Sequence, residues 1–372
     1  MMQNSRMWKP LYLNIGFRIV PKQYRGKWLR NELQKSGPVY VKMGQFMSNR
    51  EDIFGKALSE DLGSLRDRVQ PELFENIKES FSHIQGSIEE TPIASASISQ
   101  VHKGSINGKV FVFKVKRPGI LQKIQRDLDI IENFIKIVDK SLLESVFKDF
   151  KEGLYKEIDF ISEIENMKKF GEIYIDSTQV KVPKVFTELS TDDVIVMENV
   201  PSSDILKVTQ ADTAQMVMNT FLHQILFEGE VHGDLHAGNI GVSNGKLVLY
   251  DFGNVISIPG PYQVYMRELF SAIQSQDEDE IFTSMIRMGM QINDEKETRL
   301  FIKGCLKYLS TVDVNAFSTL QFTSKIPVQF DRITFQIIRT TGLVEGTCKK
   351  IDPNFSYQRA ILLCIELIAL GY

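Results

Sequence analysis

The chain has 372 residues, enough for roughly two domains and a large apolar core. Its hydrophobic content of 43% and charged content of 24% are ordinary for a globular protein, and its net charge of −3 argues against nucleic acid as a partner of the whole chain. The cysteines are scattered without a Cys-x-x-Cys pair, so we expect no disulfide framework or zinc site and infer a reducing, intracellular compartment. They are Cys305, Cys348 and Cys364.

The basic residues are concentrated at the N-terminus. Residues 1–30 contain no acid and seven bases: Arg6, Lys9, Arg18, Lys22, Arg25, Lys27 and Arg30. Such a partly apolar leader can lie on an anionic membrane or act as a transit peptide, and it can equally be the solvated face of ordinary helices. The longest apolar run, residues 360–370, is shorter than the roughly 20 residues of a membrane span and contains Glu366. We therefore expect no transmembrane helix and a soluble or peripheral protein.

Three domains are expected, at residues 1–90, 91–200 and 201–372. The first precedes any recognisable strand and is predicted to be helical. Its centre, around Lys42-Met43-Gly44-Gln45, has the composition of an amphipathic helix whose Lys and Gln are solvated.

A run of small residues follows at Ala94, Ser95, Ala96 and Ser97. In the small lobe of a kinase, a glycine-rich loop covers the phosphates at this point. Small side chains still permit close backbone approach, but Ala lacks the freedom of Gly at positive φ, so a stiffer loop is expected. Taken alone, the segment also fits a plain turn.

Asn107-Gly108 predicts a hairpin turn into a strand over residues 109–115. Alternation along that strand places Lys114 on one face with Val110 and Val112, an apolar setting in which a lysine needs a partner or a ligand. A phosphate-binding lysine and an edge-strand lysine that reaches solvent are equally compatible with this segment.

The pattern from Gly119 to about Tyr174 is helical, because apolar residues recur at steps of three and four: Ile120, Ile124, Leu128, Ile131, Ile135, Val138 and Leu142. A second stripe is expected at Leu154, Ile158, Ile161 and Ile164. Asp159 and Glu163 are four residues apart and are predicted to share a helix face, while Glu157 points elsewhere. Glu163 is our candidate partner for Lys114, and an exposed acidic face is the alternative.

Residues 194–200 are predicted to form a buried strand that ends before Pro201, at a hinge containing Met197, Glu198 and Val200. Residues 211–228 are predicted to form one amphipathic helix that leads into the loop at residues 231–239.

That loop is Val-His-Gly-Asp-Leu-His-Ala-Gly-Asn and is followed by Asp251-Phe252-Gly253. Asp234 and Asn239 are five positions apart, the spacing of the catalytic loop of protein kinases. Phosphoryl transfer needs a carboxylate near the attacking oxygen, and an Asn and a second carboxylate on Mg²⁺. Two short strands joined by an Asn-Gly turn are predicted between Asn239 and Asp251 and would hold these two residues side by side.

Together these motifs resemble the UbiB family of atypical kinases, also called the ADCK family. Lys42-Met43-Gly44-Gln45 resembles its Lys-x-Gly-Gln signature, residues 94–102 its alanine-rich loop, and residues 113–119 its strand lysine and Pro-Gly. Glu157-Ile158-Asp159 resembles its Glu-x-Asp motif, and Glu163 its helix glutamate. The resemblance covers about residues 35–260.

The resemblance implies an α+β, two-lobed, protein-kinase-like fold whose N-terminal helices cross the cleft, with Lys42 and Gln45 packed against Glu157 and Asp159 as regulatory elements. It implies ATP or ADP and Mg²⁺ as ligands, and ATPase-like activity tied to ubiquinone or another isoprenoid lipid. A lipid or membrane surface and proteins of lipid biosynthesis are the partners expected besides the nucleotide. The nucleotide would contact Ala94–Ser97, Lys114 and the hinge.

Two departures keep other functions open. His232-Gly233-Asp234 is closer to the motif of small-molecule phosphotransferases than to the family's usual Asp-Pro-His-Pro, so an enzyme acting on an aminoglycoside- or choline-like alcohol is one alternative. A pseudokinase scaffold is the other. No Ala-Pro-Glu follows Asp251, so the platform for a peptide substrate is expected to be absent.

Overall fold

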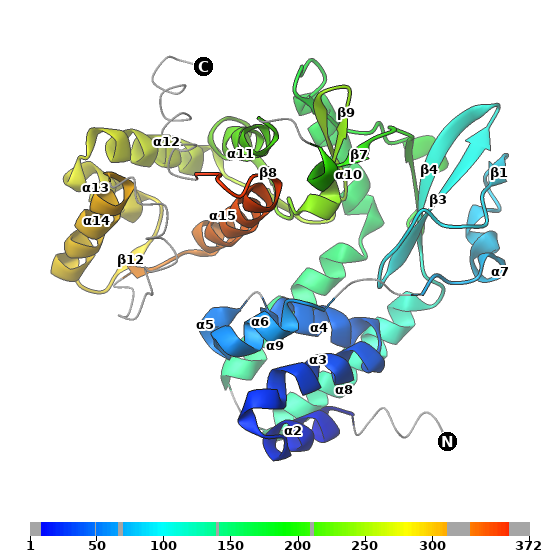
Figure 1. Ribbon diagram of the computed structural model, residues 1–372, viewed down its shortest axis with the longest axis horizontal. Coiled ribbons are helices and arrows are strands. Elements are labelled where there is room, and N and C mark those ends of the chain that lie inside the picture. Colours follow the sequence, from blue (N-terminus) through cyan, green and yellow to red (C-terminus); the bar gives the residue numbers. More distant parts are fainter. Residues whose placement is uncertain are drawn as a thin grey trace. The chain divides into compact units, whose positions relative to one another are not determined.

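The computed structural model describes residues 9–48, 50–65, 70–138, 141–208, 212–310 and 328–356. The chain divides into two compact units, one formed by Met1–Glu165 with Lys184–Asn199 and the other by Asn166–Pro183 with Val200–Tyr372. The first unit therefore contains both the N-terminal helices and the strands that follow them (Figure 1). The apolar run at residues 360–370, Cys364 and Arg6 lie outside the described residues.

The N-terminal helices of the first unit pack on two long helices that follow in sequence. Buried residues of α3 and α4, such as Leu33 and Val39, share one apolar core with Ile124 and Leu128 of α8 and Phe150 of α9. The helices of this unit are α2 (Lys9–Ile19), α3 (Arg25–Ser36), α4 (Pro38–Ser48), α5 (Glu51–Phe54), α6 (Lys56–Leu62), α7 (Phe74–Ile77), α8 (Ile120–Val138) and α9 (Ser141–Glu157).

A five-stranded antiparallel sheet completes the first unit. Its order is β1-β3-β4-β6, with β2 paired on the other side of β3. The strands are β1 (Ser87–Ile88), β2 (Ala94–Ser95), β3 (Ser99–Ile106), β4 (Lys109–Lys116) and β6 (Val194–Glu198). The prediction of helix alone before residue 90 was therefore wrong at its end, because β1 pairs with β3 through Ser87 and Ser105.

The hairpin predicted at Asn107-Gly108 is confirmed: both residues have positive φ, 50° and 78°, and connect β3 to β4. Side chains alternate along β4 as expected, but Lys114 lies on the less buried face. Phe111, Phe113 and Val115 form the buried face, whereas Val110 is 45% exposed. The burial of Lys114 must therefore come from groups outside its own strand.

The helical segment from Gly119 onwards is confirmed, as three helices. The α8 stripe is buried from Ile120 to Ile135. The second predicted stripe was wrong at one position: Leu154, Ile158 and Ile164 are buried, but Ile161 is 49% exposed. The reason is a helix break, since α9 ends at Glu157 and α10 (Phe160–Ile173) begins after Ile158-Asp159.

The second unit contains a small mixed sheet and a group of helices. The sheet order is β5-β10-β9-β7, in which only β5 and β10 are parallel. The predicted hairpin between Asn239 and Asp251 is confirmed as β9 (Ile240–Ser243) and β10 (Lys246–Leu249), with positive φ at Asn244 and Gly245. The other elements are β5 (Val180–Lys181), β7 (Ser203–Asp204), α11 (Thr213–His223), β8 (Glu230–His232), β11 (Val255–Ser257), α12 (Gly260–Ser275), α13 (Glu278–Arg287), β12 (Gln291–Ile292), α14 (Glu295–Ser310), β13 (Val328–Gln329) and α15 (Arg332–Ile351).

The helix predicted over residues 211–228 is present as α11 continued by a π-helical turn at Gln224–Glu228, which ends at Gly229 with φ of 72°. Within the described part of the chain, no helix combines the length and the apolar character that crossing a bilayer requires.

Leu128→Ala tests the shared helical core. Leu128 is fully buried, so its truncation should lower the free energy of unfolding by about 2–5 kcal/mol. Leu121, which lies on the same helix, is 47% exposed, and Leu121→Ala should cost no more than about 0.5 kcal/mol. Urea unfolding of the two variants measures the difference. Equal losses would contradict the packing of α8 described above.

Candidate active site

The first half of the candidate site is an ion pair between β4 and α10. Lys114 Nζ donates to both carboxylate oxygens of Glu163, at 2.7 and 2.8 Å. The pair is nearly dry, because the side chains of Lys114 and Glu163 are 12% and 2% exposed. The expected pairing of the strand lysine with Glu163 is confirmed.

Phe160 supplies the apolar surroundings of this pair. Its fully buried ring lies 5.4 Å from Lys114 Nζ and 4.8 Å from Lys116 Nζ. Aromatic rings attract cations through their quadrupole, so Phe160 offers both ammonium groups a favourable contact while excluding water. Sequence analysis did not identify this residue, whose position next to the helix break carries no periodic signal.

Asp159 has a local role that differs from the predicted one. It was expected to share a helix face with Glu163, but it precedes α10 and accepts hydrogen bonds from the backbone N–H of Ser162 at 3.0 Å and from Ser162 Oγ at 2.7 Å. Both bonds, and above all the one from the backbone N–H, hold the pKa of the Asp159 carboxyl below its usual value. Asp159 therefore starts the helix that presents Glu163.

The N-terminal helices are joined to α9 by two ion pairs. Lys42 Nζ lies 3.0 Å from Glu157 Oε2, and Arg50 Nη1 lies 3.6 Å from Asp149 Oδ2. Lys42 is only 17% exposed, so this lysine is not the solvated side chain that composition alone suggested. The expected contact between Lys42 and Glu157 is present.

Gly44 and Gln45 explain why the Lys-x-Gly-Gln segment packs so tightly. A Cβ at Gly44 would lie 2.3 Å from Leu65 Cδ1 and 2.8 Å from Leu33 Cδ1, so a larger residue would force these leucine side chains to shift. Gln45 Nε2 contacts the carbonyl oxygen of Leu65 at 3.5 Å, rather than Asp159 as the resemblance implied.

The Ala-Ser loop is a tight hairpin. Ala94 and Ser95 pair with Val101 and Gln100, and the backbone N–H of Ala96 donates to the carbonyl oxygen of Ser99 at 2.8 Å. Ser97 is fully buried. Three of the four predicted positions are thus held by backbone pairing, and the fourth is buried.

Arg117 fixes this loop from the end of β4. Its guanidinium donates to the carbonyl oxygen of Ala96 at 2.9 Å and to Ser95 Oγ at 2.8 Å. It also donates to the carbonyl oxygen of Gln70 at 3.0 Å and faces Glu72 at 3.4 Å. Arg117 thus connects the loop to the segment that follows the N-terminal helices, a role that its position in the sequence does not indicate.

The three predicted hinge residues are divided between the two units, and each makes contacts within its own unit. Met197 pairs with Val112, and the Glu198 carboxylate accepts a hydrogen bond from the backbone N–H of Lys184 at 3.0 Å. Val200 belongs to the second unit, where its carbonyl oxygen accepts from the Tyr250 hydroxyl at 3.4 Å.

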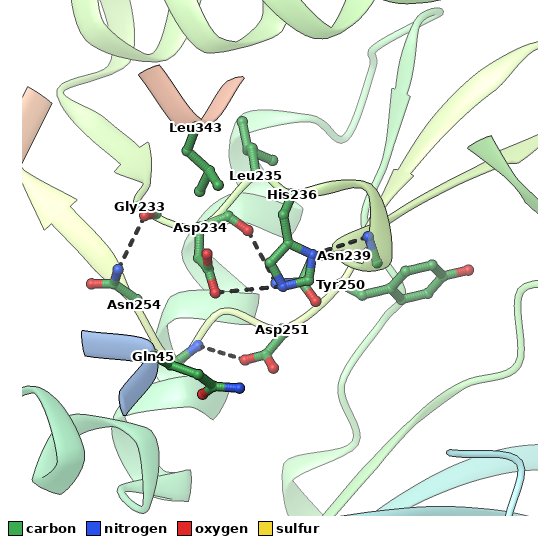
Figure 2. A network of polar contacts seen from close by, with 12 residues as sticks. Gln45, Gly233, Asp234, Leu235, His236, Asn239, Tyr250, Asp251, Asn254 and Leu343 are labelled. Carbon is green, nitrogen blue, oxygen red and sulfur yellow. Dashed lines mark hydrogen bonds and ion pairs between the residues drawn. The ribbon is translucent and has the colours of Figure 1, made fainter. Parts of the chain in front are cut away.

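The second half of the candidate site is the loop between β8 and β9, shown in Figure 2. Asn239 Nδ2 donates to the carbonyl oxygen of Asp234 at 3.0 Å, which leaves the amide oxygen as the atom of Asn239 suited to a metal. His236 Nδ1 accepts from the N–H of Gly238 at 3.0 Å, and its Nε2 lies 3.8 Å from Asp234 Oδ2. The Asp234 side chain is 45% exposed and so accessible to a substrate.

His232 supports the loop from within the core. Its Nε2 donates to the carbonyl oxygen of Tyr250 at 2.9 Å, and its Nδ1 accepts from the backbone N–H of Asp234 at 3.2 Å. Burial lowers the pKa of His232, so the ring stays neutral in the tautomer that both bonds require. His232 therefore joins the two segments that carry Asp234 and Asp251.

Asp251 is held in a backbone conformation that few residues adopt. Its φ is 57°, in the left-handed region, which indicates a constraint imposed by its neighbours. Phe252 is fully buried against Phe170 and His232, and its carbonyl oxygen accepts from Asn166 Nδ2 at 2.8 Å. Because Phe252 is anchored in this way, the backbone that carries the exposed carboxylate of Asp251 is held in place.

Helix α15 supports the same loop through two buried threonines. Thr347 Oγ1 donates to the carbonyl oxygen of Leu235 at 3.2 Å, and Thr340 Oγ1 lies 3.5 Å from the carbonyl oxygen of Gly233. These contacts satisfy backbone groups that an irregular buried loop would otherwise leave unpaired.

The two halves have the chemistry of a kinase-like protein: a strand lysine paired with a helix glutamate, and an Asp, Asn and Asp-Phe-Gly set. No cluster of three or more His, Cys, Asp or Glu side chains suited to a metal occurs among the described residues.

The chain belongs to the ABC1 atypical kinase-like family, whose domain model matches residues 59–285. It is 30% identical over 303 residues to the chloroplastic protein ACTIVITY OF BC1 COMPLEX KINASE 8 of Arabidopsis thaliana, covering 74% of this chain and 40% of that protein. It is 34% identical over 248 residues to the probable protein kinase UbiB of Photobacterium profundum, covering 60% of this chain and 46% of the relative. The expected UbiB/ADCK family is confirmed, and the chain spans about half or less of these relatives.

A solved structure shows the shared fold. The chain of the Rv3197–erythromycin complex from Mycobacterium tuberculosis is similar with a TM-score of 0.59 and 21% identity, over 83% of this chain and 87% of that one. The fold is therefore α+β and kinase-like.

Removing either partner of the Lys114–Glu163 pair should leave a buried uncompensated charge. We expect Lys114→Met and Glu163→Leu each to lower the free energy of unfolding by about 3–5 kcal/mol, and the double variant K114M/E163L to recover most of that loss. Lys151→Met breaks the more exposed pair with Glu132 and should cost about 1 kcal/mol or less. Denaturant unfolding of the four variants is the measurement. Additive losses in the double variant would contradict the buried pair.

Proposed function

We propose that this chain binds ATP with Mg²⁺ and transfers or hydrolyses its terminal phosphate as an atypical kinase or ATPase. The observation that carries the proposal is the dry pair of Lys114 and Glu163, at 2.7 Å, in a chain that also holds Asp251 in a constrained conformation. Buried charges are costly, and a lysine kept charged in this way is suited to bind phosphate.

Each site residue has a defined part in this proposal. Lys114 would bind phosphate oxygens, Glu163 would hold Lys114 in place, and Asp234 would orient the attacking hydroxyl or water and accept its proton. The backbone of Ala94–Ser97 would lie over the phosphates, and Met197, Glu198 and Val200 would line the nucleotide base. His232 would fix the segments that carry Asp234 and Asp251 relative to each other, without contacting the substrate itself.

The residues present fit a magnesium ion. Asn239 and Asp251 would hold it through an amide oxygen and a carboxylate, the hard oxygen donors that Mg²⁺ prefers. Bound there, the ion would neutralise charge on the phosphates. The hydrogen bond from Asn239 Nδ2 to Asp234 supports this assignment, because it orients the amide so that its oxygen is the available donor atom.

We further propose that α4 restricts access of protein substrates, as the resemblance implies. The ion pair of Lys42 with Glu157, six positions before Glu163, and the close packing at Gly44 support a rigid attachment of α4 to α9. Lys42, Gln45, Glu157 and Asp159 would then have regulatory roles. The physiological link would be to ubiquinone or another isoprenoid lipid, with lipid-biosynthesis proteins as partners.

Asp251→Asn tests the metal assignment with little risk to the fold, because Asn tolerates positive φ. Removing one carboxylate from a hard-cation site should abolish the Mg²⁺-dependent rise in melting temperature that ATP produces. Asp176→Asn, an exposed residue of the same unit, is the matched control and should respond as wild type. An undiminished Mg²⁺–ATP response in Asp251→Asn would contradict the assignment.

Lys42→Ala tests the regulatory role of α4. Loss of the pair with Glu157 should change ATP hydrolysis or release autophosphorylation, while the melting temperature stays close to that of wild type. Lys35→Ala removes a lysine that is 71% exposed and paired with Glu32, and it should leave both activities unchanged. Hydrolysis and autophosphorylation are measured with and without isoprenoid lipid. Unchanged activity in well-folded Lys42→Ala would favour the small-molecule phosphotransferase, and absence of hydrolysis in wild type would favour the scaffold.

A further inference from the structure

Gln224 is a fully buried polar side chain that has no part in the site as described above. Its amide makes two hydrogen bonds. Nε2 donates to the Tyr174 hydroxyl at 3.0 Å, and Oε1 accepts from the backbone N–H of His232 at 2.9 Å. A backbone N–H can only donate, so the bond to His232 decides which end of the amide is the oxygen. Gln224 therefore has one defined orientation, with its oxygen directed at the strand that leads to Asp234.

This side chain stands at the start of the π-helical turn that continues α11. The backbone N–H of Gly229 donates five positions back, to the carbonyl oxygen of Gln224, at 2.9 Å. Within the turn, Arg267 Nη1 donates to the carbonyl oxygen of Leu226 at 2.6 Å. Single π-helical turns are rare and occur frequently at functional sites. Here the turn contains the side chain that reaches the strand before the candidate catalytic loop.

Three successive backbone N–H groups lead into that loop, and each has a different acceptor. The N–H of His232 donates to Gln224 Oε1. The N–H of Gly233 donates to the carbonyl oxygen of Asn254 at 2.8 Å, and Asn254 Nδ2 donates back to Gly233 at 3.1 Å (Figure 2). The N–H of Asp234 donates to His232 Nδ1 at 3.2 Å. Gln224 is the acceptor of the three that comes from a helix, so its replacement leaves both motifs of the site intact.

The strand β8 explains why the N–H of His232 depends on this acceptor. His232 is the last residue of β8 and is opposite Val255 of β11, but its N–H bonds to Gln224. The residue is fully buried, and a buried donor that loses its acceptor bears the whole cost of its desolvation. Without the Gln224 oxygen, the end of β8 would therefore have to shift to satisfy this N–H. Such a shift would move the backbone that carries Asp234.

Tyr174 holds the Gln224 amide from its other end. It follows α10 directly and is 8% exposed, and burial raises the pKa of its hydroxyl, so the group stays neutral and accepts the bond from Nε2. The ring of Phe170, one turn earlier, lies 6.4 Å from the rings of both Tyr174 and His232. The contacts from the end of α10 through Gln224 to His232 are thus buried along their whole length.

We propose that Gln224 is a positioning residue for phosphoryl transfer, whose amide oxygen sets, through the N–H of His232, the backbone that carries the Asp234 carboxylate. The inference rests on the proposed function, in which Asp234 orients the attacking hydroxyl or water. Gln224 acts without contacting nucleotide or metal. Because catalysis by positioning is sensitive to displacements of about 1 Å, loss of this acceptor slows the chemical step. Lys114 and Asp251 are held by other contacts, so Mg²⁺ and ATP still bind.

The alternative is that Gln224 only stabilises the fold. The loss of a buried hydrogen bond lowers stability wherever the bond lies, without a specific effect on turnover. A positioning role instead lowers kcat and leaves the KM for ATP nearly unchanged. The two roles are separated by steady-state kinetics at a temperature at which each variant is folded.

The experiment measures Mg²⁺-dependent ATP hydrolysis by the full chain in wild type, Gln224→Met and Tyr174→Phe, with folding checked by circular dichroism. Methionine has a similar size and no acceptor oxygen, so Q224M should lower kcat at least about tenfold and keep the KM for ATP within about threefold. Y174F loosens the amide but leaves its oxygen in place. Its kcat should therefore fall less, by about two- to fivefold.

Gln215→Met is the matched control, because it makes the same replacement on the same helix. Gln215 Nε2 donates to Asn219 Oδ1 at 2.7 Å, outside the contacts of Gln224, so Q215M should keep the wild-type kcat. Hydrogen–deuterium exchange without nucleotide adds a readout that needs no activity. Exchange over residues 230–234 should become faster in Q224M and stay unchanged in Q215M.

Folded Q224M with the kcat of wild type would overturn the inference and leave the proposed function intact. Equal losses of kcat in Q224M and Q215M, or unchanged exchange over residues 230–234 in Q224M, would also overturn it. If Q224M does not fold, an unchanged kcat in Y174F would have the same consequence. Absence of hydrolysis in wild type would overturn the proposed function, and this inference with it.

Discussion

The ion pair of Lys114 and Glu163 is the constraint on which the candidate site depends. Both charges are withdrawn from water, and each is stabilised by the other, which lies within 2.8 Å. Three features of the first unit serve this geometry: the β4 strand that presents the lysine, the Asp159 cap that starts α10, and the Phe160 ring beside the ammonium group. Further along α10, Asn166 donates to the carbonyl oxygen of Phe252. This bond anchors the residue that follows Asp251, the candidate metal ligand.

In the second unit, the residues that support the loop are buried, and the candidate reactive groups are exposed. His232, Phe252 and the threonines of α15 are buried and satisfy the backbone of an irregular loop. Asp234 and Asp251 remain exposed to solvent. A buried frame fixes the positions of two exposed carboxylates, which suits chemistry that depends on positioning and charge neutralisation more than on covalent catalysis by the protein.

Local patterns in the amino-acid sequence predicted much of this fold and of the candidate site. Asn-Gly turns located both hairpins, and the period of α8 gave its buried stripe. The need of a kinase-like strand lysine for a helix glutamate gave the pairing of Lys114 with Glu163. Features that depend on tertiary contacts were missed or wrong. A helix break at Asp159 exposes Ile161 despite its apolar spacing, and Arg117 acts on residues 21 and 47 positions away. Gly44 packs against the side chains of Leu33 and Leu65, a contact that its own neighbours in sequence do not reveal.

The central proposal is that Asn239 and Asp251 hold the metal ion of a bound nucleotide. The most direct measurement is a crystal structure with a non-hydrolysable ATP analogue and Mn²⁺ in place of Mg²⁺, located by anomalous scattering. The account predicts a Mn²⁺ peak coordinated by Asn239 Oδ1, the Asp251 carboxylate and the phosphates of the analogue. A metal peak bound by other residues, or an analogue bound with no metal at Asn239 and Asp251, would contradict it.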